Sequence, residues 1–181
     1  IGSLAAGYHF FAGDGARAIR TKDVDCLFSP HSKAIAAATE VTDQLIKADW
    51  KLREDTTWGQ PGKEGDSDDE LPMVRLRPPG ETASPWFLEL LSAPPAFEPG
   101  APGKKLRRVE TSIGHFAICS FDFLALAEWQ PLETAHGVRI ARPEMMALAN
   151  LPHHPKVADT LTAGTDYKRS NKDPGRALPL A

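Results

Sequence analysis

Two carboxylates in the first part of the chain have the spacing of a cation site. Asp23 and Asp25 stand two residues apart, directly before the apolar run Cys26–Phe28. In a β-strand alternate side chains share a face, which would place the two carboxylates about 6.5–7 Å apart along the strand. Mg²⁺ binds through one or two carboxylates together with substrate phosphates. The pair therefore predicts a magnesium site on one face of a strand that we expect over residues 20–28.

A Gly-Ser turn at the start of the chain is a candidate for holding the phosphates of such a substrate. Gly2 and Ser3 follow the apolar Ile1 and precede a run of small residues. This pattern predicts that residues 1–3 end a strand and that residues 4–11 form a short helix. Backbone N–H groups at a helix N-terminus bind phosphate. Gly2 and Ser3 are therefore candidate nucleotide-binding residues.

The segments GSLAAGYHF and RTKDVDCLF, in this order, resemble the signature of the nucleotidyltransferase superfamily. In that superfamily a GS or GG turn is followed by a D-x-D strand. The form of the second segment is similar to the branch that includes the AbiEii-type toxins of toxin–antitoxin systems. The resemblance implies transfer of a nucleotidyl group from an NTP to an acceptor hydroxyl. It also implies Mg²⁺, or Mn²⁺ in its place, at Asp23 and Asp25, and an antitoxin protein as a partner.

A third carboxylate lies inside the near-continuous apolar run Trp86–Leu91. A charge in such a run is costly unless it is paired or bound to a metal. In nucleotidyltransferases a later strand supplies a third carboxylate, so the resemblance implies that Glu89 completes the metal site or acts as the base. Two alternatives stay open: Glu89 pairs with Arg75 or Arg77 on a neighbouring strand, or Asp122 is the third carboxylate instead.

A basic cluster lies near the C-terminal end of the sequence. Lys168 and Arg169 are its first members, and they are followed by Lys172 and Arg176. The segment KRSNKDPGR resembles a basic segment of the AbiEii-like branch, which implies contact with nucleotide or RNA phosphates. The alternative is a solvated basic segment.

The composition is that of an ordinary globular protein. Of the 181 residues 41% are hydrophobic and 25% charged, and the formal net charge of −3 creates no global field that would attract nucleic acid. No signal peptide or membrane-spanning run is visible, and Cys26 and Cys119 lack metal-like spacing, which favours buried thiols in a reducing cytoplasm. The chain opens at Ile1 inside an expected strand, so we expect an N-terminal segment to be missing.

The longest predicted element is an amphipathic helix that runs to about Arg53, with Ser29 as its N-cap and Pro30 at its first helical position. A polar loop follows over residues 54–72, and its acidic run is expected to be solvated. Further expected elements are strands at 73–77, 86–91, 116–126 and 138–140 and a helix at 142–150.

This order predicts an α+β fold with a mixed β-sheet and helices on one face, of the nucleotidyltransferase type. We expect a single domain, with a core over residues 1–135 and a strand-helix appendage over 136–181 that packs on the core.

Three functional hypotheses follow from these patterns. The first is a nucleotidyltransferase whose acceptor, a tRNA, a protein side chain or a small molecule, the sequence does not identify. The second is a catalytically inactive module of the same fold that binds a protein or RNA partner. The third is a metal-dependent phosphohydrolase that uses the same carboxylates and releases phosphate rather than pyrophosphate.

Overall fold

The computed structural model describes residues 1–11, 23–52, 60–80, 86–94, 105–120 and 123–149. The chain divides into two compact units, each of which is described by itself. The sheet unit comprises Thr21–Asp122, and the terminal unit combines Ile1–Arg20 with Phe123–Ala181. The described helices are all too short or too polar to cross a lipid bilayer.

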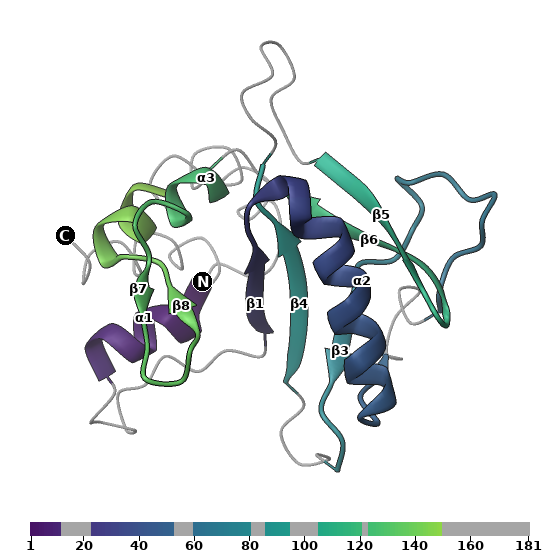
Figure 1. Cartoon of the computed structure of the whole chain (residues 1–181), viewed down its shortest axis with the longest axis horizontal. Coiled ribbons are helices and arrows are strands. Elements are labelled where there is room, and N and C mark those ends of the chain that lie inside the picture. Colours follow the sequence, from purple (N-terminus) through teal and green to yellow (C-terminus); the bar gives the residue numbers. More distant parts are fainter. Residues whose placement is uncertain (12–22, 53–59, 81–85, 95–104, 121–122, 150–181) are drawn as a thin grey trace, which may run out of the picture. The chain divides into compact units, whose positions relative to one another are not determined.

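A mixed sheet forms the body of the sheet unit (Figure 1). Strand β1 (Asp23–Phe28) runs parallel to β4 (Phe87–Ser92) and pairs with it over its whole length. The other edge of β4 is shared by β3 (Arg75–Arg77), which is antiparallel, and by β6 (Gly114–Ser120), which is parallel. The prediction of an α+β fold with a mixed sheet is therefore confirmed.

Two further strands extend this sheet. Strand β2 (Lys51–Leu52) pairs antiparallel with β3, and β5 (Lys105–Thr111) forms a seven-position antiparallel ladder with β6. The sequence reading placed no strand at β5. The charged residues of β5 obscure the alternation of apolar and polar positions. An edge strand, which is paired on one side only, tolerates such charges.

Helix α2 (His31–Lys47) covers one face of the sheet (Figure 1). Its inward positions Ala34, Ala38 and Thr42 are buried and small, so the helix axis can lie close to the strands. The core beneath the helix consists of buried apolar side chains from β3, β4, β5, β6 and the residue before β3: Val74, Leu76, Leu90, Val109, Phe116 and Ile118.

Both ends of α2 differ from the prediction. At the start, Pro30 is the N-cap residue and no side chain caps the helix, so Ser29 is not the cap. At the end, the helix stops at Lys47 and not near Arg53. Asp49 adopts a φ of 64°, and the N–H of Trp50 donates to the carbonyl of Leu45 at 3.0 Å. This left-handed closing turn terminates the helix and frees the chain to enter β2.

The strand predicted at 116–126 is wrong in its second half. Strand β6 ends at Ser120, and helix α3 (Leu124–Ala127) begins soon afterwards, in the terminal unit. A short apolar run does not distinguish strand from helix by periodicity alone, which accounts for the error.

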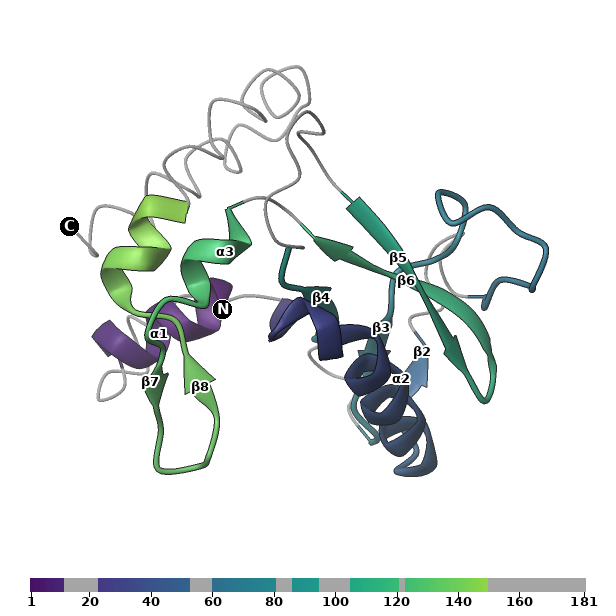
Figure 2. The ribbon, with the colours of Figure 1, turned by 45° about the horizontal axis from the view of Figure 1, so that its top comes forward.

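The terminal unit contains short elements. Helix α1 spans Gly2–Phe11, and β7 (Leu132–Glu133) pairs antiparallel with β8 (Arg139–Ile140) in a hairpin (Figure 2). Residues 143–149 are helical, as predicted. The carbonyl of Ala141 accepts a hydrogen bond from His9 Nε2 at 2.9 Å, which ties α1 to the segment after the hairpin.

Candidate functional site: a carboxylate row on one sheet face

The D-x-D carboxylates lie on the sheet face opposite α2. Cys26 and Phe28 of β1 pack against the core beneath the helix. Because side chains alternate along a strand, Asp23 and Asp25 point to the other face. The predicted D-x-D strand and its apolar inner face are therefore confirmed over Asp23–Phe28.

Strand pairing brings the third predicted carboxylate beside the second. Asp25 of β1 and Glu89 of β4 are register partners in the parallel ladder. Register partners on adjacent strands share a face, and adjacent strands lie about 4.8 Å apart. Asp23, Asp25 and Glu89 thus belong to one sheet face, and all three are half-buried.

Arg75 of β3 engages Glu89 from the other side. The guanidinium Nε donates to Glu89 Oε2 at 3.1 Å, and Nη2 donates to Oε1 at 3.2 Å. The exposed fractions of the two side chains are 28% and 16%. Such a bidentate, partly desolvated pair is stronger than an ordinary surface ion pair. The ion pair with Arg75, one of the two alternatives left open for Glu89, is therefore present.

The Arg75 side chain has a second neighbour on the same face. Its guanidinium carbon lies 5.8 Å from the ring centroid of Phe87, within the range of a cation–π contact. Sequence reasoning did not assign Phe87 any role. The available signal was its position two residues before Glu89, which places both side chains on one face of a strand.

The carboxylates of this face supply the oxygen donors that a hard cation prefers. Carboxylate oxygens in adjacent register match the one or two carboxylates that Mg²⁺ takes from a protein. Within the part of the chain that the structure describes, no three His, Cys, Asp or Glu side chains converge on a point that could hold a metal. The donor types suit a two-carboxylate site, and both oxygens of Glu89, the third carboxylate, accept hydrogen bonds from Arg75.

The Gly-Ser pair lies in the terminal unit, and the carboxylates lie in the sheet unit. Gly2 and Ser3 are in the first turn of α1, so the expectation that they end a strand is wrong. Gly2 has a φ of 72°, a left-handed conformation that glycine adopts without strain. The first turn of α1 contains no acidic residue that would repel an anion.

Some predicted residues lie outside the described ranges. These are Lys168, Arg169 and the rest of the basic cluster, together with Asp122, the rival third carboxylate.

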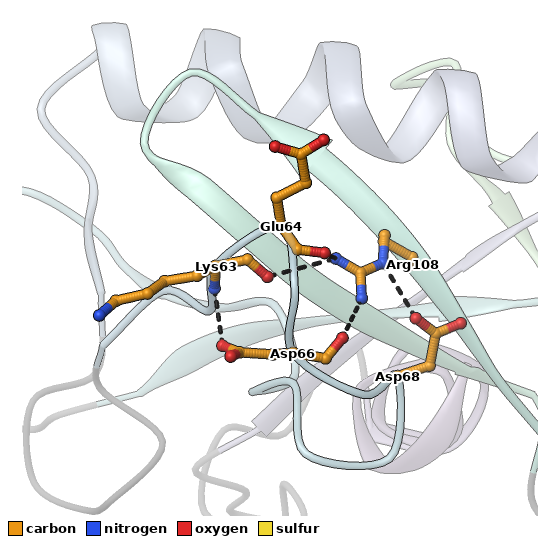
Figure 3. A network of polar contacts seen from close by, with 5 residues as sticks. All are labelled: Lys63, Glu64, Asp66, Asp68 and Arg108. Atoms are coloured by element: carbon orange, nitrogen blue, oxygen red, sulfur yellow. Dashed lines mark hydrogen bonds and ion pairs between the residues drawn. The ribbon is translucent and has the colours of Figure 1, made fainter.

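The loop that carries the acidic run makes defined contacts with β5 and β6. Residues 60–72 are fixed by Arg108 of β5, whose guanidinium donates to the Asp68 carboxylate at 2.9 Å and to the carbonyls of Lys63, Glu64 and Asp66 (Figure 3). The loop is also bridged to β6 by paired hydrogen bonds between Gly62 and His115. Arg108 thus pairs with the Asp68 carboxylate, while most of the acidic run stays exposed, as the sequence predicts.

No family model, curated protein or solved structure matches the chain.

Proposed function

We propose that this chain is a Mg²⁺-dependent nucleotidyltransferase that moves a nucleotidyl group from an NTP to an acceptor hydroxyl. The observation that carries the proposal is the register of Asp25 with Glu89. It puts the D-x-D pair and the later glutamate on one sheet face, away from the covering helix. The resemblance of the first 28 residues to nucleotidyltransferases supports the same reading.

The proposed roles follow from the chemistry of each group. Asp23 and Asp25 supply hard oxygen ligands, and Mn²⁺ could replace Mg²⁺. When bound, the metal neutralises negative charge on the triphosphate. The sequence resemblance assigns phosphate binding to Gly2 and Ser3, which lie in the first turn of α1.

Glu89 is the proposed base. The acceptor oxygen attacks the α-phosphorus, and the bond from that phosphorus to the pyrophosphate oxygen breaks. Glu89 takes the proton of the acceptor hydroxyl as the new oxygen–phosphorus bond forms. This role requires a Glu89 carboxylate released from Arg75, which holds both of its oxygens in the described conformation.

A second candidate function is favoured by the same ion pair. If Arg75 keeps Glu89 permanently, the chain is an inactive module of the nucleotidyltransferase type that binds a protein or RNA partner. The two candidates differ in a measurable property, because only the transferase needs Mg²⁺ and an NTP.

Labelled NTPs test the reaction. We would incubate the protein and Mg²⁺ with each NTP labelled at the α- or the γ-phosphate, in the presence of tRNA, of total protein or of aminoglycosides. The proposal predicts that an acceptor keeps the α-label, whereas the γ-label leaves as pyrophosphate. Asp25→Asn should abolish transfer, and Glu110→Gln, an exposed carboxylate on the edge strand β5, should not.

Two other results would overturn the transferase assignment. Release of the γ-label as orthophosphate would indicate the phosphohydrolase. Transfer that persists undiminished in a folded Asp25→Asn variant would remove the carboxylate row from the mechanism.

A further inference from the structure

We propose that Arg75 is a triphosphate-binding residue whose ion pair with Glu89 is its resting position. In the metal-free protein Arg75 neutralises Glu89, and on arrival of a metal–NTP complex it exchanges this carboxylate for phosphate oxygens. The inference rests on the proposed function and adds to it a residue outside the sequence motifs.

The register places Arg75 at the right point of the sheet. Arg75 is the register partner of Glu89, and Glu89 is the register partner of Asp25, so the three form one row across β3, β4 and β1. Neighbours in such a row are about 4.8 Å apart. Phosphate groups of a nucleotide whose metal is bound at Asp25 and Glu89 would therefore lie near the Arg75 guanidinium.

The guanidinium suits both partners. Its planar fork of N–H donors already makes two parallel hydrogen bonds to Glu89, at 3.1 and 3.2 Å. The same fork matches two oxygens of a phosphate, which is the geometric reason that arginine recognises both groups. A cation bound to Glu89 takes away the charge that holds Arg75, and the phosphates of the NTP supply a replacement.

The surroundings favour exchange over a permanent pair. The Arg75 side chain retains 28% exposure, so water still screens the pair, and its strength stays near the upper end of the range for surface ion pairs. A pair of this strength weakens the binding of a competing cation to Glu89 by about 5-fold. Phe87 lies under the guanidinium carbon at 5.8 Å and would keep it at this face after Glu89 is released.

The same strand offers a matched control. Arg77 lies two residues along β3, on the same face as Arg75, and its register partner is Lys51 of β2 rather than a carboxylate of β4. An Arg77→Gln variant therefore removes one positive charge from the same strand face, at a position outside the row of Arg75, Glu89 and Asp25.

The experiment measures two affinities in wild type, Arg75→Gln and Arg77→Gln. The first is for Mn²⁺ alone, followed through the electron paramagnetic resonance signal of the free ion. The second is for each NTP with Mg²⁺, by calorimetry. Arg75→Gln should bind Mn²⁺ about 3- to 5-fold more tightly, because Glu89 is released. It should bind the Mg²⁺–NTP complex about 10-fold or more weakly, because charge-assisted hydrogen bonds to phosphate are lost. Arg77→Gln should change neither affinity by more than about 2-fold.

The opposite signs of the two changes identify the exchange. If the Mg²⁺–NTP affinity of a folded Arg75→Gln variant equals that of wild type, Arg75 is only a structural partner of Glu89 and the inference is wrong. In that case the proposed function still stands if wild type binds the Mg²⁺–NTP complex and the Asp25→Asn variant does not. If wild type binds no NTP, the proposed function itself fails and this inference fails with it.

If Arg75→Gln does not fold, nuclear magnetic resonance of the wild-type protein tests the same exchange. The Nε–H resonance of Arg75 should shift when the Mg²⁺–NTP complex is added, and that of Arg77 should shift less. An unmoved Arg75 resonance at saturating NTP refutes the exchange.

Discussion

Replacing Arg108 by alanine should release residues 63–70 of the acidic loop without unfolding the sheet. The guanidinium makes one ion pair, to Asp68 at 2.9 Å, a close contact with the carbonyl of Asp66, and two long contacts at 3.3 and 3.4 Å. Asp68 is 50% exposed, so that pair is worth about 1 kcal/mol or less. The charge-assisted bond to the Asp66 carbonyl adds about 1.5 kcal/mol, and the long contacts add little.

The expected total is about 2 kcal/mol, which corresponds to a roughly 30-fold increase in the population of an open loop. The hydrogen bonds between Gly62 and His115, at 2.8 and 3.0 Å, do not involve Arg108 and should keep the loop attached to β6. Hydrogen exchange followed by mass spectrometry should therefore show faster exchange in peptides from 63–70 and unchanged exchange in β4 and β6.

Arg107→Ala is the matched control, because Arg107 is the preceding residue of β5 and its exposed side chain points to the opposite face. It should leave the loop protected. If Arg107→Ala and Arg108→Ala give the same exchange in the loop, the contacts of Figure 3 do not hold it and the reasoning fails.

Two further predictions concern the core. Leu90→Ala should lower the free energy of unfolding, measured by urea denaturation, by about 2–5 kcal/mol, because Leu90 is fully buried in β4. Leu148→Ala, at a residue that is 48% exposed, should change it by about 0.5 kcal/mol or less. Equal effects of the two substitutions would refute the assigned core. Burial raises the pKa of the Cys26 thiol, so the folded state keeps this proton to higher pH than the unfolded state does. Its contribution to stability is complete below the ordinary thiol pKa of about 8.5 and is lost as the pH rises through the folded-state pKa. Cys26→Ala should therefore flatten the alkaline decline of the unfolding free energy, and an unchanged slope would contradict the pKa shift.

The local elements of the site could be predicted from the sequence. Alternation of Asp23 and Asp25 with apolar residues indicates a strand that is polar on one face only, and β1 has this form. The apolar run around Glu89 likewise indicates β4. Both patterns depend on the two-residue period of a strand, which is a local property.

The pairing of these strands could not be predicted. That Asp25 meets Glu89, and that Arg75 lies on the far side of Glu89, depends on the register of segments more than 60 residues apart in one case and 14 in the other. The sequence offered Arg75 and Arg77 as equal partners for Glu89, and only the register selects Arg75. Similarly, the end of α2 depends on the conformation of Asp49, a residue type that allows but does not require a left-handed turn.

The central claim is that the carboxylate row binds a metal–NTP complex, and calorimetric titration tests it most directly. Each NTP would be titrated into wild-type protein with Mg²⁺, then with EDTA, and finally into a folded Asp23→Asn/Asp25→Asn variant. The account predicts that at least one NTP binds with Mg²⁺, and that binding is lost with EDTA and in the variant. Absence of binding for every NTP in folded wild-type protein, or equal binding in the variant, would contradict it.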